Sequence, residues 1–445
     1  QALAGDWLAA AETLFQRTHA RSGNRQDESV SERLFGYLLR LDTATLTEAS
    51  RKARDPDWRQ WLQMQLVYRE GPDAVSTWMT QPNALPRHPV MPQHVRRWAT
   101  AESVDHIALL LPLEGRLSGA GEAVLSGAID QLYTLFPDPS SRPTLTTLNS
   151  IQPQSVKDLY RQAVADGADL VIGPLIKEHV TSLGQLAQRR VPVIALNQTD
   201  SLTGSSKRNW TSLSLAPEDE ARQVADIAYG QACRHAIVVG MKSDRGARLL
   251  SSFTDRWAQH GGRILGQLVV DNPADTNTEM GKLLGSGPSD QRIRAVERAF
   301  DLPVDSRGRG RSDFECIFML APDAATARTW RPLLVFHMAG DVPVYATSAI
   351  NDGVADTRNR DLNGVLFVET PAMLPPEMTD RLSRLRALGR DALTLAQHWQ
   401  QTTETEQWVV RGQTGLLRRK QDGSVERALE LATFDGARIR PAALP

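Results

Sequence analysis

The stretch HIALLLPLEG at residues 106–115 decides the fold, because an unbroken apolar run is followed at once by proline and glycine. Such a run is typical of a strand that is buried on both faces of a parallel sheet. Apolar residues then recur at helical spacing between positions 124 and 135. We therefore predict a strand at 107–111, a helix after it, and an α/β fold that begins there.

The same alternation of short strands and amphipathic helices occurs twice along the chain. Strands are expected at 107–111, 144–148, 170–172 and 193–196 in the first series, and at 236–239, 264–270, 316–320 and 342–346 in the second. This pattern is the signature of doubly wound parallel sheets. It predicts two Rossmann-like lobes, at residues 104–212 and 213–370.

The regions that flank the two lobes have different patterns. Residues 1–81 show only helical periodicity, which predicts a small all-α array of tetratricopeptide type. Four prolines then indicate a stiff linker at 82–103. In the tail, 371–445, we expect a helix and then a hairpin that turns at Asp422-Gly423, both packing back on the two lobes.

Composition excludes several classes of protein. The 445 residues carry 51 basic and 52 acidic side chains, so no basic excess marks a nucleic-acid partner. The apolar runs are far shorter than the roughly 20 residues of a membrane-spanning helix. Because the chain begins at Gln1 with no charged and apolar leader, we expect a processed or trimmed N-terminus.

Sequence motifs for catalysis and cofactor binding are missing. The glycines at 115, 119 and 121 do not have the spacing of a dinucleotide-binding loop, and no G-x-S-x-G, H-E-x-x-H or C-x-x-C motif occurs. The histidines are scattered, without metal-ligand spacing. We therefore expect no enzymatic activity, no cofactor and no metal.

Two further features have open interpretations. Cys233 precedes the first strand of the second lobe, and Cys316 begins the third strand. These two strands are neighbours in a 2-1-3-4 order, so the two cysteines either form a disulfide or remain two buried thiols. The basic loop with Arg307, Arg309 and Arg311 is either a solvated loop or a contact for an acidic protein or anionic polymer.

The two lobes resemble a type I periplasmic binding protein, and several stretches resemble the LppC-type lipoproteins. These stretches are HIALLLPLEG at 106–115, LVIGPL at 170–175, VIALN at 193–197, SLAPEDEAR at 214–222, DLNGVLF at 361–367, GQTG at 412–415 and GSVER at 423–427. Each of them is short, but their order along the chain makes the resemblance specific.

The resemblance implies a non-enzymatic periplasmic regulator of peptidoglycan synthesis. Such a protein binds a class A penicillin-binding protein and stimulates its transpeptidase, and peptidoglycan itself is a possible further partner. The full-length lipoprotein is held at the inner face of the outer membrane by a lipid on an N-terminal cysteine. No such cysteine lies near Gln1, so the chain is expected to be either trimmed or a short member of the family.

The alternative function is a periplasmic receptor that captures a small ligand between the lobes. The cleft would then be lined by residues that follow the strands: Leu113, Glu114, Gly115, Pro174, Leu175, Asn197, Gln198 and Thr199 in the first lobe, and Met241, Lys242, Ser243, Ala321 and Pro322 in the second. Receptors of this fold hold amino acids with a serine-rich loop, where this chain has Lys177 and Glu178. The regulator is therefore the preferred interpretation.

Overall fold

The computed structural model describes residues 6–19, 28–81, 91–92, 95–96, 99, 104–199, 202, 209–301, 309–375, 379–399, 409–420 and 422–442. The chain forms two compact units. Unit 1 comprises Gln1–Leu215 and Arg384–Ala428, and unit 2 comprises Ala216–Ser383 and Leu429–Pro445. The backbone therefore passes from one unit to the other after residues 215, 383 and 428.

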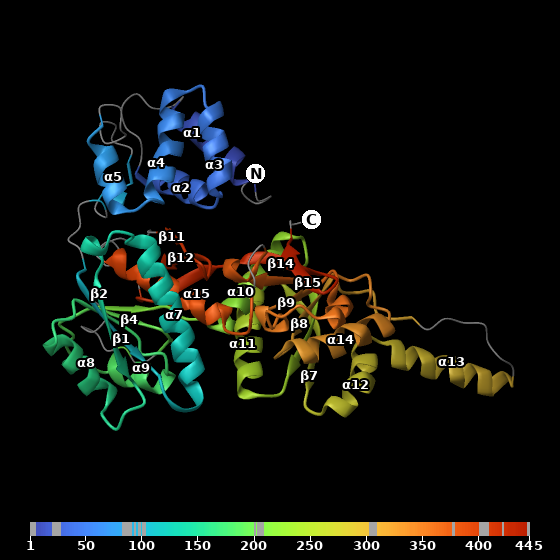
Figure 1. Cartoon of the computed structure of the whole chain (residues 1–445). Helices are drawn as coiled ribbons and strands as arrows, with labels where there is room; N and C mark the ends of the chain where they lie inside the picture. Colours follow the sequence, from blue (N-terminus) through green and yellow to red (C-terminus); the bar gives the residue numbers. More distant parts are fainter. Residues whose placement is uncertain are drawn as a thin grey trace. The chain divides into compact units, whose positions relative to one another are not determined.

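The N-terminal part of unit 1 is helical, as predicted (Figure 1). Its helices are α1 (Trp7–His19), α2 (Glu28–Leu39), α3 (Thr43–Lys52), α4 (Pro56–Tyr68) and α5 (Pro72–Met79). Asp42 and Asp55 begin α3 and α4 by accepting hydrogen bonds from backbone N–H groups of the first turn. The buried faces share one apolar core, in which Phe35, Trp61 and Leu62 are almost fully enclosed.

A five-stranded parallel sheet forms the centre of unit 1, with the order β2-β1-β3-β4-β5. Its strands are β1 (His106–Leu111), β2 (Thr144–Asn149), β3 (Leu170–Ile172), β4 (Val193–Ala195) and β5 (Trp210–Ser212). In the register, Ile107 lies between Leu145 of β2 and Leu170 of β3. The sequence pattern does not predict β5.

Helices cover both faces of this sheet (Figure 1). One face packs against α7 (Ser118–Leu135) and α15 (Ser383–Gln397), and the other against α8 (Val156–Ala165) and α9 (Lys177–Gly184). Leu109 therefore contributes to one core and its neighbour Leu110 to the other. A small antiparallel sheet of β11 (Val409–Arg411), β12 (Leu416–Arg419) and β13 (Val425–Ala428) completes the unit.

Unit 2 is built on a seven-stranded sheet with the order β15-β14-β10-β9-β8-β6-β7. The strands are β6 (His235–Met241), β7 (Arg263–Val270), β8 (Cys316–Leu320), β9 (Val344–Ala346), β10 (Leu366–Glu369), β14 (Glu430–Asp435) and β15 (Arg438–Pro441). The first five are parallel, while β14 and β15 add antiparallel pairs at one edge. The sequence pattern predicts neither β10 nor this antiparallel edge.

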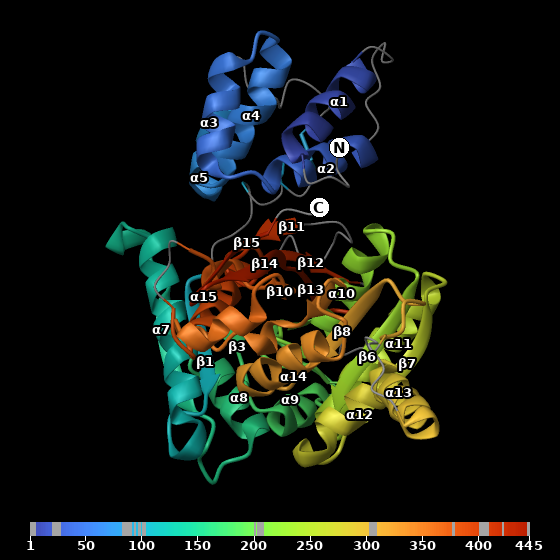
Figure 2. The same cartoon turned by 90° about the vertical axis from the view of Figure 1, so that its right-hand side faces the viewer.

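The helices of unit 2 again lie on both faces of the sheet (Figure 2). On one face are α10 (Pro217–Gly230) and α11 (Asp244–Gln259), and on the other are α12 (Thr276–Leu283) and α14 (Ala324–Phe336). Helix α13 (Ser286–Phe300) differs, because its buried residues are confined to Ser286 and Ser289 near its start. The rest of α13 extends away from the sheet (Figure 1).

The expected α/β class with two doubly wound sheets and a helical N-terminal region is confirmed. The predicted domain boundaries stay predictions, and most of the proline-rich linker lies outside the described residues. Within the described ranges, no helix is both long enough and apolar enough to cross a membrane.

Candidate functional site

The cleft residues predicted for the first lobe follow β1, β3 and β4, which are neighbours in the sheet of unit 1. The amide of Asn197 donates to the carbonyl oxygen of Leu175 at 3.1 Å, and Leu196 N donates to the carbonyl of Pro174 at 3.0 Å. The loops after β3 and β4 are therefore fixed to each other. Between β1 and α7, by contrast, Glu114 is exposed.

Polar groups in these loops have partners within unit 1. The N–H of Leu113 donates to Asn149 Oδ1 at 3.1 Å, and the hydroxyl groups of Thr199 and Thr181 are 3.2 Å apart. Gln198 N donates to Asn197 Oδ1 at 2.9 Å. Thr199, one of the predicted cleft residues, is thus engaged locally, which gives the alternative function no support.

The residues predicted for the second lobe lie at the end of β6 or directly after β6 and β8, which are neighbours in the sheet of unit 2. The Nζ atom of Lys242 donates to Asp271 at 2.6 Å, and Ser243 begins α11 by accepting a hydrogen bond from Gly246 N. Ala321 is buried, and Pro322 is partly buried beside it. Participation of these groups in a cleft stays a prediction.

The three arginines of the basic loop have different environments. Arg307 lies outside the described residues, Arg309 is exposed, and Arg311 makes hydrogen bonds to Asp313 at 2.8 and 2.9 Å. The bonds to Asp313 raise the pKa of the Arg311 guanidinium. Because Arg311 also donates to the carbonyl of Leu283, it fixes the loop to α12.

The cysteines of unit 2 are joined by a disulfide bond, with their Sγ atoms 2.00 Å apart. They come together because β6 and β8 are adjacent and Ala236 is paired in register with Cys316. Of the two interpretations left open by the sequence, the structure therefore contains the disulfide.

A buried carboxylate in unit 1 was not singled out from the sequence. Asp391 of α15 accepts hydrogen bonds from Gln413 N, Thr414 N and the Thr414 hydroxyl. Burial raises the pKa of Asp391 to about 6, although these bonds act in the opposite direction. The acid thus holds the GQTG stretch at 412–415 against α15 and has a structural role.

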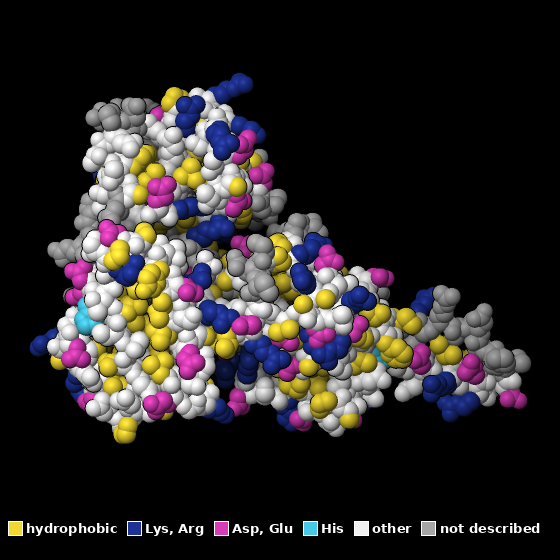
Figure 3. All heavy atoms as spheres, in the orientation of Figure 1, with side chains coloured by type: hydrophobic (Ala, Val, Ile, Leu, Met, Phe, Trp, Pro, Cys, Tyr) yellow, Lys and Arg dark blue, Asp and Glu magenta, His cyan; other side chains and the backbone are white. Residues whose placement is uncertain are grey.

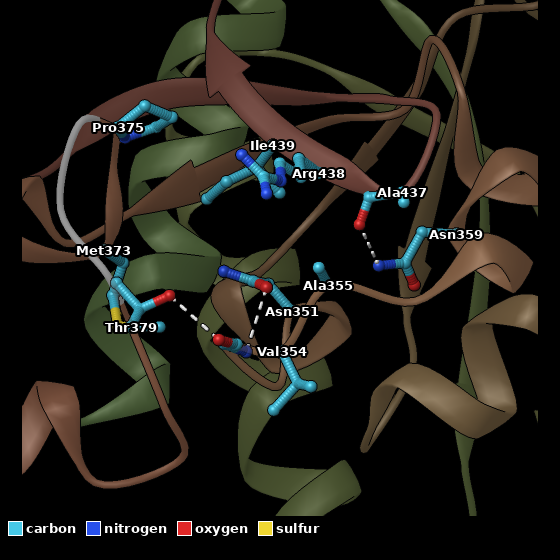
Figure 4. Close-up of a pocket in the computed structure, with 11 residues that line it drawn as sticks. Asn351, Val354, Ala355, Asn359, Met373, Pro375, Thr379, Ala437, Arg438 and Ile439 are labelled. Atoms are coloured by element: carbon cyan, nitrogen blue, oxygen red, sulfur yellow. Dashed lines mark hydrogen bonds between the residues drawn. The ribbon is translucent and has the colours of Figure 1, made fainter.

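A pocket in unit 2 was also missed by sequence reasoning (Figure 4). Its volume is about 480 Å³, and it includes the buried side chains of Asn351 and Asn359 and the exposed side chain of Arg438. No sequence signal indicated it, because its residues come from loops and a strand edge that are distant in the chain. It does not include any of the predicted cleft residues.

Charged side chains of both signs lie on the surface of the molecule. Basic and acidic side chains are interspersed over the face shown in Figure 3, without a field of one sign. In the parts of the chain that the structure describes, no three histidine, cysteine or acidic side chains converge as metal ligands.

Comparisons with known proteins identify relatives of this chain and solved structures with a similar fold. A curated relative, penicillin-binding protein activator LpoA from Photobacterium profundum, is 27% identical over 439 residues, which cover 93% of this chain and 70% of the relative. Among solved structures, this chain is similar to the LpoA (YraM) C-domain from Haemophilus influenzae, which is described as a regulator of PBP1A. The match has a TM-score of 0.61 and 22% identity, and it covers 76% of this chain and 99% of that domain.

A putative branched-chain amino acid ABC transporter from Chromobacterium violaceum also matches, with a TM-score of 0.56 and 25% identity over 74% of this chain and 99% of that one. The solved structures thus agree on a periplasmic binding protein-like fold. The family model described as LppC putative lipoprotein matches residues 2–436. This chain therefore belongs to the LppC family.

Proposed function

We propose that this chain is a non-enzymatic regulator that binds a class A penicillin-binding protein and stimulates its transpeptidase activity. The observation that carries the proposal is the relationship to the penicillin-binding protein activator LpoA, which extends over 93% of the chain. The protein acts in the periplasm, and its full-length form is a lipoprotein anchored to the outer membrane.

Activation requires binding that differs between two states of the synthase. A regulator with equal affinity for the active and inactive conformations would not change their populations, however tightly it bound. The regulator must therefore present a rigid surface to the active conformation. In unit 2 the disulfide and the continuous seven-stranded sheet supply that rigidity.

Helix α13 and Arg309 after it are the contact surface that we favour. Val296 is 43% exposed and Phe300 is 70% exposed, although both are apolar. Arg294 and Arg298 of the same helix are exposed, as is Arg309 after it. Figure 3 shows basic and acidic side chains along this helix.

A surface of this kind suits a partner with an apolar patch and acidic groups around it. Aromatic side chains and arginines are the residue types that contribute most to protein interfaces. Apolar burial would supply affinity, while the arginines would accelerate association and fix orientation. Arg311 contributes indirectly, because its bonds to Asp313 hold the base of the loop.

The experiment is a binding measurement with an immobilised class A penicillin-binding protein from the same source. Phe300→Ser is expected to weaken binding about tenfold or more, as for a central interface aromatic. The paired change Arg294→Ser and Arg298→Ser should slow association and reduce its salt dependence. Tyr133→Ser, which removes an aromatic side chain that is 58% exposed on α7, is the matched control and should bind like the parent.

The outcomes test the proposed contact surface on α13 and the proposed activator function independently. If the α13 variants bind like the parent, the synthase contacts another face, although the activator function stands. If the parent chain itself does not associate with any class A synthase of its source, the proposed function is wrong.

A further inference from the structure

The pocket of unit 2 has the size and composition of a site for a small ligand. Its volume of about 480 Å³ falls within the range of small-molecule pockets, which is roughly 300 to 1,000 Å³. Its walls come from the loop after β9, the 3-10 turn at Thr357–Leu362, the loop after β10 and the β14–β15 hairpin. All of these segments belong to unit 2, so the pocket is complete within that unit.

Most of the lining is apolar. The side chains that give it this character are Val354, Ala355, Met373, Pro375 and Ile439. Figure 4 shows Ile439 on one side of the pocket and Val354 on the other. An apolar group of a few carbon atoms would therefore replace water in the pocket favourably.

The neutral polar groups of the wall already have partners. The Asn351 amide donates to Glu369 at 2.7 Å, and its oxygen accepts a hydrogen bond from Gly353 N at 3.1 Å. The hydroxyl of Thr379 donates to the carbonyl of Gly353 at 2.8 Å. These bonds hold the loop after β9 in place before any ligand enters.

The opposite wall is fixed by a second buried asparagine. Asn359 donates to the carbonyl of Ala437 at 3.1 Å and accepts hydrogen bonds from Arg328 at 2.7 and 2.9 Å. The guanidinium of Arg328 also lies 3.7 Å from Asp352 and 3.6 Å from Asp356. The negative charges nearest to this wall are therefore compensated by a cation of the protein.

Arg438 is the charged side chain among the lining residues. It is exposed on β15, and none of the described residues accepts a hydrogen bond from its guanidinium or forms an ion pair with it. In Figure 4 it lies across the pocket from Asn351. A guanidinium at the edge of an apolar, preorganised pocket is suited to a carboxylate, which it can bind through two parallel hydrogen bonds.

We propose that this pocket binds a small ligand with a short apolar body and a carboxylate, and that Arg438 pairs with the carboxylate. A free carboxylic acid and the C-terminal residue of a peptide share this chemistry. The proposal concerns unit 2 alone and does not depend on the activation of a synthase.

The test is calorimetric titration of the full chain with matched probes. For the free acid, 4-methylpentanoate is compared with 4-methylpentanamide; for the peptide source, N-acetyl-alanyl-leucine is compared with its C-terminal amide. We expect the carboxylate of at least one pair to bind about tenfold or more tightly than its amide, because the charge-assisted bond is lost in the amide. The pair that shows this preference identifies the source.

Two variants locate the binding. Arg438→Gln should abolish the preference for the carboxylate, whereas Arg440→Gln should keep it. Arg440 is the matched control because it lies on the same strand, pairs with Asp435 at 3.3 Å and does not line the pocket. Equal binding of acid and amide, binding that is unchanged in Arg438→Gln, or the absence of binding by all four probes would overturn the proposal.

Discussion

The Nη1 atom of Arg411 lies 2.6 Å from the carbonyl oxygen of Leu41, although 370 positions separate the two residues in the sequence. The same nitrogen is 3.2 Å from the carbonyl of Arg40. These carbonyls follow the end of α2, where a helix leaves backbone oxygens without partners in the helix itself. Arg69, at the end of α4, also donates to the carbonyl of Leu41, so the strand from the tail adds a second donor to this turn of the helical region. All of these residues belong to unit 1.

Removal of this guanidinium should loosen the helical region. We expect Arg411→Met to reduce the free energy of unfolding by about 2 kcal/mol, which is typical of hydrogen bonds that involve a charged group. Hydrogen exchange of the backbone at residues 38–43 measures the effect locally. Arg418→Met is the control, since Arg418 pairs with the exposed Glu426. Exchange rates equal to those of the parent would show that the contact does not hold the helices.

The crossing of α7 and α15 gives a second prediction. A Cβ atom at Gly389 would lie 2.0 Å from the carbonyl oxygen of Val124, and one at Gly127 would lie 1.9 Å from that of Arg386. Gly389→Ala should therefore force the helices apart and reduce the free energy of unfolding by about 3 kcal/mol. Urea denaturation measures this change.

The matched control for the helix crossing is Gly119→Ala in the first turn of α7, where an added Cβ would meet no atom within 4 Å. It should be neutral or slightly stabilising, because alanine is the better helix former. A Gly389→Ala variant as stable as this control would contradict the close approach.

The strands with long apolar runs could be predicted from the sequence. Residues 107–111 form β1 because a strand that is buried on both faces must be apolar at every position. β5, by contrast, has three residues and no apolar run, so only its pairing with Val193–Ala195 defines it as a strand. Residues 430–435 pair with β10, and this choice of partner depends on tertiary structure that local patterns do not encode.

The candidate sites were less predictable than the fold. The order of parallel strands shows which strand ends are neighbours, and it predicts that Cys233 lies close to Cys316. The pocket could not be deduced, because Asn351, Met373 and Ile439 lie in loops or at a sheet edge with no common spacing. The structural role of Arg311 could not be predicted either, because the carbonyls that accept its hydrogen bonds belong to other elements.

The disulfide of unit 2 should contribute measurably to stability. It closes a loop with a sequence separation of 83, so reduction should lower the free energy of unfolding by about 4.5 kcal/mol in the chain-entropy model. Thiol titration in denaturant should find no free thiols before reduction and two after it. Two free thiols in the chain purified without reductant would show that the cysteines are not bonded.

Asp391 should make the stability of unit 1 depend on pH. Burial raises its pKa from 3.8 to about 6, so the stabilisation is complete below about pH 4 and is lost as the pH rises through 6. Between about pH 4 and 7 the free energy of unfolding of the parent should fall by about 2 kcal/mol relative to Asp391→Asn. Urea denaturation at several pH values measures this difference.

The control for the pH series is Asp166→Asn, which changes an exposed acid at the end of α8. Its free energy of unfolding should follow that of the parent across the whole pH range. If the difference between the parent and Asp391→Asn does not change with pH, the buried carboxyl does not titrate as described.

The central claim is that the chain activates a class A penicillin-binding protein, and the rate of peptide crosslinking tests it most directly. A purified synthase from the same source would polymerise and crosslink its lipid-linked substrate with increasing amounts of the chain, with Phe300→Ser in parallel. We predict a saturable increase in crosslinks per glycan, with the response to the variant shifted to higher concentration. Crosslinking that stays at the level of the synthase alone, even with the chain in excess, would contradict it.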